Sequence, residues 1–201
     1  MVELFTFLIQ YVNFVKMSRS IQAHDVLAVF VNFGFRKTSM AEIAQAAGLS
    51  RQALYYRFDS KEAVLKWVLT TITGESLKDT EAISSDETKP LPDRLVQMYD
   101  TWAGQHLDVL RHTPNGREIF SVGYRMMESD ADSEAYQAEK KVMQQIAALL
   151  RKSGLAKSPA AARDMAFALN CASSGLMLIA ESRADYVAGI KRVVSAILAK
   201  S

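Results

Sequence analysis

The sequence predicts an all-α protein with an N-terminal three-helix helix-turn-helix domain followed by a larger helical domain. Apolar residues recur at helical spacing over most of the chain after about residue 20. Only four prolines and nine glycines occur in 201 residues, which leaves room for long helices. Hydrophobic residues make up 49% of the chain and charged residues 23%, the balance of an ordinary globular protein.

The first two helices are indicated by their end signals. One is expected from about Ser20 to Phe33, with Gly34 ending it. Its inward face should carry Ile21, Leu27, Phe30 and Phe33. The second should begin at Met40, because Ser39 and Glu42 have the spacing of a capping box.

The third helix carries the residues of greatest functional interest. Gly48 should end the second helix, and Ser50 should cap the third at its N-terminus. Leu54 and Phe58 are four residues apart and should face inward. The remaining face should project outward, and it holds Arg51, Gln52, Ala53, Tyr55, Tyr56 and Arg57. Glutamine and arginine can bond adenine and guanine bidentately, so this helix is predicted to enter the major groove of DNA.

Six further helices are expected along the rest of the chain. The first starts at Lys61 behind the cap Ser60, where a helix N-terminus and a lysine both suit a phosphate, and it should run to about Lys78. Residues 80–92 are polar and should form a loop. The other five should cover about Asp93–His112, Pro114–Glu128, Glu134–Ser153, Pro159–Glu181 and Asp185–Lys200.

The last two helices are predicted to form a homodimer interface through about residues 158–200. The stretch from Met165 to Ala180 is apolar nearly all round, so it needs burial on two sides. Small residues such as Ala168 and Gly175 would let helices approach closely in a four-helix interface. The alternative is that both helices simply complete the core of a monomer.

The charge distribution favours DNA over other partners. The net charge is only +2, but residues 16–66 hold eight basic and four acidic residues. From residue 67 onward, 16 basic residues face 17 acidic ones. The positive charge therefore lies on the segment with the helix-turn-helix, as attraction to phosphate requires.

A set of short motifs links this segment to a known family. They are Gly34-Phe35, Thr38-Ser39, Ile43-Ala44, Ala47-Gly48-Leu49-Ser50, Leu54-Tyr55-Tyr56-Arg57-Phe58 and Ser60-Lys61-Glu62. Together they resemble the TetR family of bacterial transcriptional regulators, over about Ile21 to Leu69. The resemblance implies an all-helical homodimer whose C-terminal domain binds a small ligand.

The resemblance also implies roles for individual residues. Arg51 and Gln52 would read base edges, and the others would contact phosphate, sugar or a thymine methyl. The predicted DNA-binding residues are Thr38, Ser39, Ser50, Arg51, Gln52, Ala53, Tyr55, Tyr56, Arg57 and Lys61. Phe58 matches the aromatic core residue of the family and should not touch DNA.

Aromatic and methionine side chains of the middle helices predict an apolar effector pocket. The predicted ligand-binding residues are Tyr99, Trp102, His106, Phe120, Tyr124, Met127, Met143, Asn170 and Cys171. A small apolar or weakly polar effector would fit them best. For any one of these residues, plain core packing is the alternative.

Enzyme, cofactor and metal functions are not expected, because no catalytic or metal-ligand spacing occurs. His106 and His112 fall off a common helix face, which argues against a paired metal site. Cys171 is the only cysteine, so no intrachain disulfide is possible, and a reducing cytoplasm is expected.

The N-terminal 16 residues are strongly apolar and form a predicted segment of their own. They are too short to span a bilayer comfortably and lack the basic start of a signal peptide. They are interpreted as an upstream start or as an extension packed on the body, without stable membrane association. The predicted division is therefore 1–16, 17–66 for the DNA-binding domain and 67–201 for the ligand-binding and dimerisation domain.

Two functions follow. The preferred one is a ligand-responsive dimeric transcriptional regulator, in the form of a repressor that a small molecule releases from a palindromic operator. The alternative is a small-molecule binding or protein-interaction module whose helix-turn-helix does not read DNA.

Overall fold

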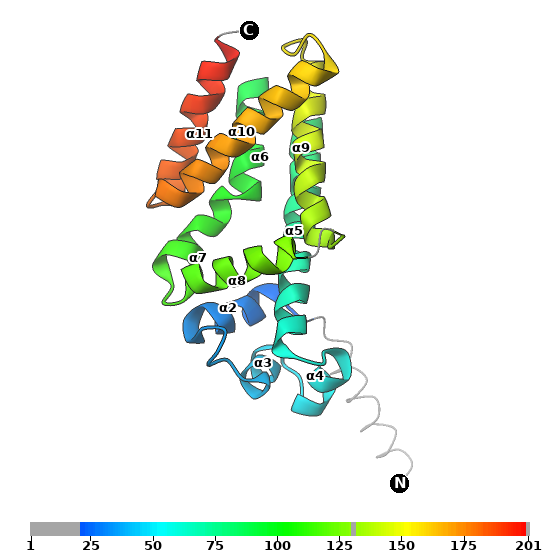
Figure 1. Ribbon diagram of the computed structural model, residues 1–201, viewed down its shortest axis with the longest axis vertical. Helices are drawn as coiled ribbons and strands as arrows, with labels where there is room; N and C mark the ends of the chain where they lie inside the picture. The colour runs from blue at the N-terminus through cyan, green and yellow to red at the C-terminus, as the bar shows by residue number, and fades with distance from the viewer. Residues whose placement is uncertain (1–20, 130–131, 200–201) are drawn as a thin grey trace.

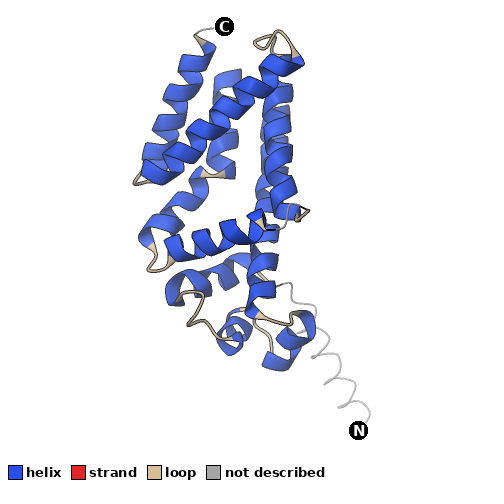
Figure 2. Cartoon of the chain, in the orientation of Figure 1, coloured by secondary structure: helices blue, strands red, loops and turns tan. Residues whose placement is uncertain are grey.

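The computed structural model describes residues 21–129 and 132–199, and these residues form helices and connecting loops without any strand (Figure 2). The elements are α2 (Ala23–Phe33), α3 (Met40–Ala46), α4 (Arg51–Arg57), α5 (Lys61–Ser85), α6 (Leu91–Trp102), the 3₁₀ turn η1 (Gly104–His106), α7 (Leu107–His112), α8 (Gly116–Glu128), α9 (Glu134–Lys152), α10 (Pro159–Ile179) and α11 (Arg183–Leu198). The all-α prediction is confirmed. Predictions for Ser20, Lys200 and the apolar segment 1–16 lie outside the described residues.

The helices form two groups joined by one long helix. In Figure 1, α2, α3 and α4 lie at one end of the molecule, and α5 runs from them into the group formed by α6, α9, α10 and α11. Helix α8 lies between the groups and packs against both α2 and α5. The recognition element is therefore held at the tip of a body that is several helices deep.

The caps that the sequence predicts all form. Glu42 N–H donates to Ser39 Oγ at 3.3 Å while Ser39 N–H donates to the Glu42 carboxylate at 2.8 Å, which closes the capping box. Ser50 and Ser60 Oγ accept from the backbone N–H three residues on, at 3.1 and 3.2 Å. Gly48 has φ of 65°, the left-handed conformation expected of a helix-ending glycine.

Phe33 is a correction to the predicted core. It is 52% exposed, whereas Ile21 and Leu27 pack against the N-terminal core and Phe30 is fully buried within it. The chain turns at Gly34, and Phe35 stacks on Phe30 with ring centroids 5.9 Å apart. The residue after the turn therefore takes the inward position that the helical pattern assigned to Phe33.

Helix α5 is longer than predicted, because residues 80–85 are helical rather than part of a loop. The hydroxyl of Thr80 is buried and donates to the Leu77 carbonyl at 2.8 Å, and Ser84 Oγ bonds the Glu81 carbonyl. Polar side chains that bond to their own helix can continue it, although their composition suggests a loop.

Two hydrophobic clusters meet along α5. Val64, Leu65, Val68 and Ile72 belong to the N-terminal cluster, and Leu77 and Ile83 pack against the C-terminal one. The change of cluster falls between residues 72 and 77, further along the chain than the predicted boundary at 66. Ile119 of α8 also enters the N-terminal cluster, so that core draws on a helix remote in sequence.

The predicted helix over residues 93–112 is wrong, because it breaks after Trp102 into η1 and α7. Gly104 explains the break. A Cβ at this position would lie 2.6 Å from Asp100 Oδ1 and 2.8 Å from a ring carbon of Tyr186 on α11. The close approach of α11 therefore requires a glycine here, and the bend turns α7 toward α8.

The C-terminal helices follow the prediction closely. Ser158 caps α10 ahead of Pro159, accepting from Ala161 N–H at 3.1 Å, and Gly154 after α9 has φ of 78°. Helix α10 ends two residues earlier than expected and α11 begins two residues earlier. None of the described helices is long and apolar enough to cross a membrane.

Candidate nucleic-acid interface

Helix α4 presents the exposed face that the sequence predicts. Arg51, Gln52 and Arg57 are exposed, Tyr55 is 44% exposed and Tyr56 is 93% exposed. Large aromatic side chains are rarely left in water without a use, so this face is suited to a partner. Ala53 is half-buried on the same helix and lies beside the cap Ser50.

The opposite face of α4 is anchored firmly. Leu54 is fully buried in the N-terminal core, and Phe58 packs on Trp67 of α5 with ring centroids 5.5 Å apart. Phe58 thus lies on the inner side, as predicted. Because the backbone of α4 is fixed from behind, its outward side chains can be held in one register.

The guanidinium of Arg51 lies over the ring of Tyr55, 5.6 Å from its centroid. These residues are one helical turn apart, so the contact is local to α4. A cation–π contact restrains the long arginine side chain and leaves its N–H donors facing outward. The pair is therefore arranged as a planar donor group beside an aromatic surface.

Thr38 and Lys61 lie differently from the rest of the predicted set. Thr38 is only 2% exposed, and its hydroxyl donates to the Gly34 carbonyl at 2.8 Å. Lys61 Nζ donates to the carbonyls of Phe35 (2.7 Å) and Arg36 (3.0 Å). It also reaches the Thr38 carbonyl at 3.4 Å and lies over the Phe35 ring. An ammonium has three donors, so this geometry uses all of them within the fold.

Ser39 is exposed but engaged with Glu42. The Ser39 hydroxyl donates to the Glu42 carboxylate at 2.8 Å, in addition to the capping bonds. The backbone and side-chain hydrogen bonds from Ser39 hold the pKa of Glu42 below its usual value. A phosphate contact at Ser39 would therefore lie next to an ionised carboxylate, whereas the exposed face of α4 is free of acidic residues.

Lys61→Ala is expected to lower the free energy of unfolding by roughly 2 kcal/mol, since it strips three carbonyls of a charged donor. In a chain of this size that corresponds to a fall of about 4–8 °C in Tm. This corrects the sequence-based expectation that the variant would weaken DNA binding without affecting the fold. Thermal unfolding followed by circular dichroism measures the change.

Lys37→Ala is the matched control, because it removes the same charge from an exposed position in the same loop. Its Tm should stay within about 2 °C of the parent, as for most surface substitutions. Equal Tm values for the two variants would contradict the role assigned to Lys61.

The comparisons with known proteins bear on this helix-turn-helix directly. Residues 27–68 match the family model described as bacterial regulatory proteins of the tetR family. The helix-turn-helix domain is of the TetR type. The match contains α3, α4 and the start of α5, so it covers every predicted DNA-binding residue.

Solved TetR-family structures share the fold along nearly the whole chain. A putative regulator from Mesorhizobium loti is 21% identical, with a TM-score of 0.61 over 89% of this chain and 93% of that one. PfmR from Thermus thermophilus is 17% identical, with a TM-score of 0.62 over 88% and 96%. FadR from Bacillus subtilis, solved with stearoyl-CoA, is 14% identical, with a TM-score of 0.62 over 94% and 99%. No curated protein matches the sequence significantly.

The structure does not gather the predicted ligand-binding residues of this TetR-type chain around one cavity. Tyr99 is fully buried in the C-terminal core, Trp102 packs at its edge, and Met143 and Asn170 are half-buried. Phe120 and Tyr124 stack on the exposed side of α8, with centroids 6.4 Å apart. Cys171 is exposed on α10, and the side chain of Met127 is not among those described. Their assignment to an effector site stays a prediction.

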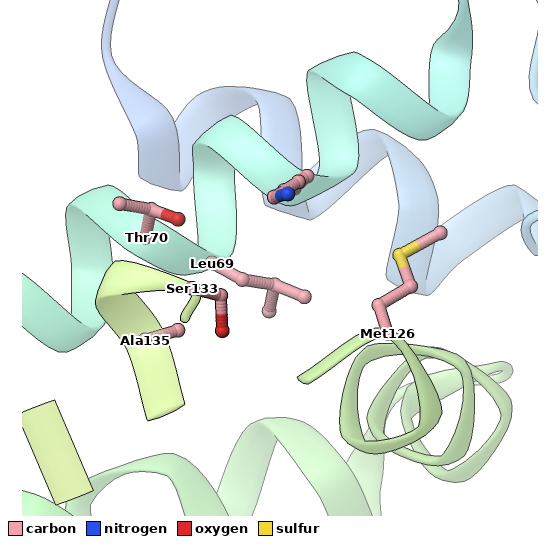
Figure 3. Close-up of a pocket in the computed structure, with 6 residues that line it drawn as sticks. Leu69, Thr70, Met126, Ser133 and Ala135 are labelled. Atoms are coloured by element: carbon pink, nitrogen blue, oxygen red, sulfur yellow. The ribbon is translucent and has the colours of Figure 1, made fainter. Parts of the chain in front are cut away.

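The pockets that the structure does contain have other linings. One lies between α5, α8 and the start of α9 (Figure 3), where Leu69, Met126 and Ala135 face Lys66, Thr70 and Ser133. Its volume of about 10 Å³ is room for a single water molecule at most. The other is an open hollow of about 290 Å³ lined by Glu87, Arg94, Leu149, Lys152 and Ser153. Neither contains a residue of the predicted set.

A polar cluster inside the body was missed as a unit by the sequence analysis, which named only His106. His106 Nε2 lies 3.5 Å from Ser76 Oγ of α5, and Gln105 Nε2 donates to the same oxygen at 3.2 Å. Burial lowers the pKa of His106 to about 4, with smaller contributions from the positive charges of His24 and Arg183. The sequence offered no sign of the cluster, because Ser76 is 29 and 30 residues from its partners.

The buried histidine predicts a pH dependence of stability. His106 is neutral in the folded state above about pH 4, whereas in the unfolded chain it binds a proton below about pH 6.5. The unfolded state therefore binds more protons between these values, and the free energy of unfolding falls as the pH drops through them. The contribution of His106 to this fall should be about 2 kcal/mol between pH 7 and pH 5.

Urea denaturation at the two pH values measures this, with carboxylate effects removed by comparison with variants. His106→Gln should lose the contribution, and His112→Gln, at an exposed position, should keep it. The same pH dependence in all three proteins would contradict the burial of a neutral imidazole. Among the described residues, no group of three His, Cys, Asp or Glu side chains is placed to hold a metal ion.

Proposed function

We propose that this protein is a dimeric, effector-responsive transcriptional regulator that binds a palindromic DNA operator and acts as a repressor in the cytoplasm. The observation that carries the proposal is the outward face of α4. Arg51, Gln52, Tyr55 and Tyr56 are exposed on a helix that is fixed from behind by Leu54. Such a helix can place donors and aromatic surface against base edges in the major groove.

Dimerisation is proposed through α10 and α11. One face of α10 is exposed and mostly apolar or small, and it carries Phe167, Ala168, Cys171, Ser174, Gly175, Leu178 and Ile179. Phe167, Leu178 and Ile179 are 62%, 76% and 75% exposed. A second copy packed on this face would remove that apolar surface from water and would provide the second recognition helix that a palindrome needs.

The proposed effector is small and apolar or weakly polar. FadR from Bacillus subtilis, which shares the fold, was solved with stearoyl-CoA. In this chain the interior polar cluster of Ser76, Gln105 and His106 would offer hydrogen bonds to an uncharged group. An effector that binds one arrangement of the helices more tightly shifts the equilibrium toward it and, by linkage, changes operator affinity. A catalytic function forms no part of the proposal.

Titration of a fluorescent mixed-sequence duplex tests the DNA-binding part. Affinity should fall by tenfold or more between about 50 and 200 mM salt, because bound phosphates release counterions. Absent or salt-insensitive affinity would overturn the proposal and favour a binding or interaction module whose helix-turn-helix does not read DNA.

A further inference from the structure

Arg111 of α7 caps the C-terminal end of α10. Its Nη2 donates to the carbonyls of Met177 (2.9 Å) and Leu178 (2.7 Å). Its Nε donates to the carbonyl of Ala180 at 3.1 Å. Carbonyls in the last turn of a helix lack partners within the helix, and a positive charge suits that end of the helix dipole. The guanidinium therefore fixes α7 to the end of α10.

Asn115, four residues further on, caps a helix of the other group. Its backbone N–H donates to the Val31 carbonyl at 2.9 Å. Its Nδ2 donates to the Asn32 carbonyl at 2.9 Å and reaches the Val31 carbonyl at 3.4 Å. Both carbonyls lie in the last turn of α2, inside the helix-turn-helix domain. The turn between α7 and α8 is thus bonded to α2.

The segment between the two caps has little freedom. Thr113 Oγ1 donates to the Val109 carbonyl at 2.6 Å, and Pro114 follows with a fixed φ. A Cβ on Gly116 would lie 2.4 Å from the Val109 carbonyl oxygen, so α8 begins in close contact with α7. In Figure 1 this turn connects α7 to α8 directly beside α2. We call residues 111–115 the double cap.

We propose that Arg111 and Asn115 are positioning residues for DNA binding, which hold α2 at a fixed place relative to α10. This inference rests on the proposed function, because α10 is the helix that would form the dimer. With both caps in place, the separation of the two α4 helices in the dimer is fixed along a route independent of α5. Movement of α7 would loosen both ends of the double cap together.

Hydrogen–deuterium exchange of the full chain tests the link without DNA. In Arg111→Met, exchange should rise at the end of α10 and also, by about fivefold or more, in the last turn of α2, which Arg111 does not touch. In Asn115→Ala the rise should appear reciprocally at residues 176–182. Arg151→Met is the matched control, since it removes an arginine that caps the Ala156 carbonyl at 3.2 Å outside the double cap.

A rise confined to the neighbourhood of each substitution would overturn the inference, because two independent caps do not couple distant helices. If Arg111→Met fails to fold by circular dichroism, Arg111→Lys and the Asn115→Ala arm decide the matter. Coupled exchange in a wild-type protein that binds no DNA would overturn the proposed function alone. Uncoupled exchange in a protein that binds DNA would overturn the double cap alone. On an operator, the coupled variants should also discriminate less between half-site spacings that differ by one base pair.

Discussion

Gln52→Ala is expected to weaken binding to the operator by about tenfold to a hundredfold and to relax the base preference at one position of each half-site. A bidentate contact from a glutamine amide to adenine contributes about 1–3 kcal/mol of discrimination, and a dimer makes the contact twice. Gln52 is exposed in the first turn of α4 and has no part in the core. Its loss should therefore leave Tm unchanged.

Gln45→Ala is the control for this experiment, because Gln45 is an exposed glutamine on α3 rather than on the recognition face. Fluorescence anisotropy on the operator and on its single-base variants gives both affinity and specificity. Equal losses for Gln52→Ala and Gln45→Ala, or an unchanged base preference in Gln52→Ala, would remove the base-reading role.

Phe167→Glu is expected to convert the dimer to a monomer and to reduce operator affinity at least a hundredfold. Phe167 is 62% exposed on the apolar face of α10, close to Cys171 at one helical turn. A glutamate there would place two like, desolvated charges near each other across a symmetric interface, which costs several kcal/mol. A monomer also loses the simultaneous engagement of two half-sites.

Ala160→Glu adds the same charge to an exposed position in the first turn of α10, away from the apolar face. Sedimentation velocity should show a dimer for this control and a monomer for Phe167→Glu. A dimeric Phe167→Glu variant with full operator affinity would place the dimer interface elsewhere.

The helix-turn-helix could be predicted from the sequence because its determinants are local. Ser39, Ser50 and Ser60 each satisfy backbone donors only three residues away, and Gly48 ends its helix by its own conformational preference. Local signals of this kind need no knowledge of the rest of the fold. The same holds for the Ser158-Pro159 start of α10.

The features that the sequence did not predict all depend on distant partners. The break at Gly104 is set by the ring of Tyr186, 82 residues further along the chain. Lys61 has a local motif position that suggests phosphate, but the carbonyls of residues 35, 36 and 38 take its donors. Arg111 and Asn115 carried no motif at all, because the helix ends that they cap are 66 to 69 and 83 to 84 residues away.

The candidate sites divide along the same line. The exposed face of α4 follows from helical periodicity, so the sequence analysis assigned its members to one surface. An effector pocket depends on how six or more helices pack, and composition alone placed buried Tyr99 and exposed Phe120 in one set. Aromatic and methionine residues serve cores and pockets equally, so their presence does not separate the two.

The central claim is that the wild-type dimer reads DNA through α4, and selection of bound duplexes from a random DNA pool tests it most directly. The account predicts enrichment of a palindrome whose half-sites are about one helical turn apart, and loss of that enrichment in Gln52→Ala and Phe167→Glu. A wild-type protein that enriches no sequence at low salt would contradict the account.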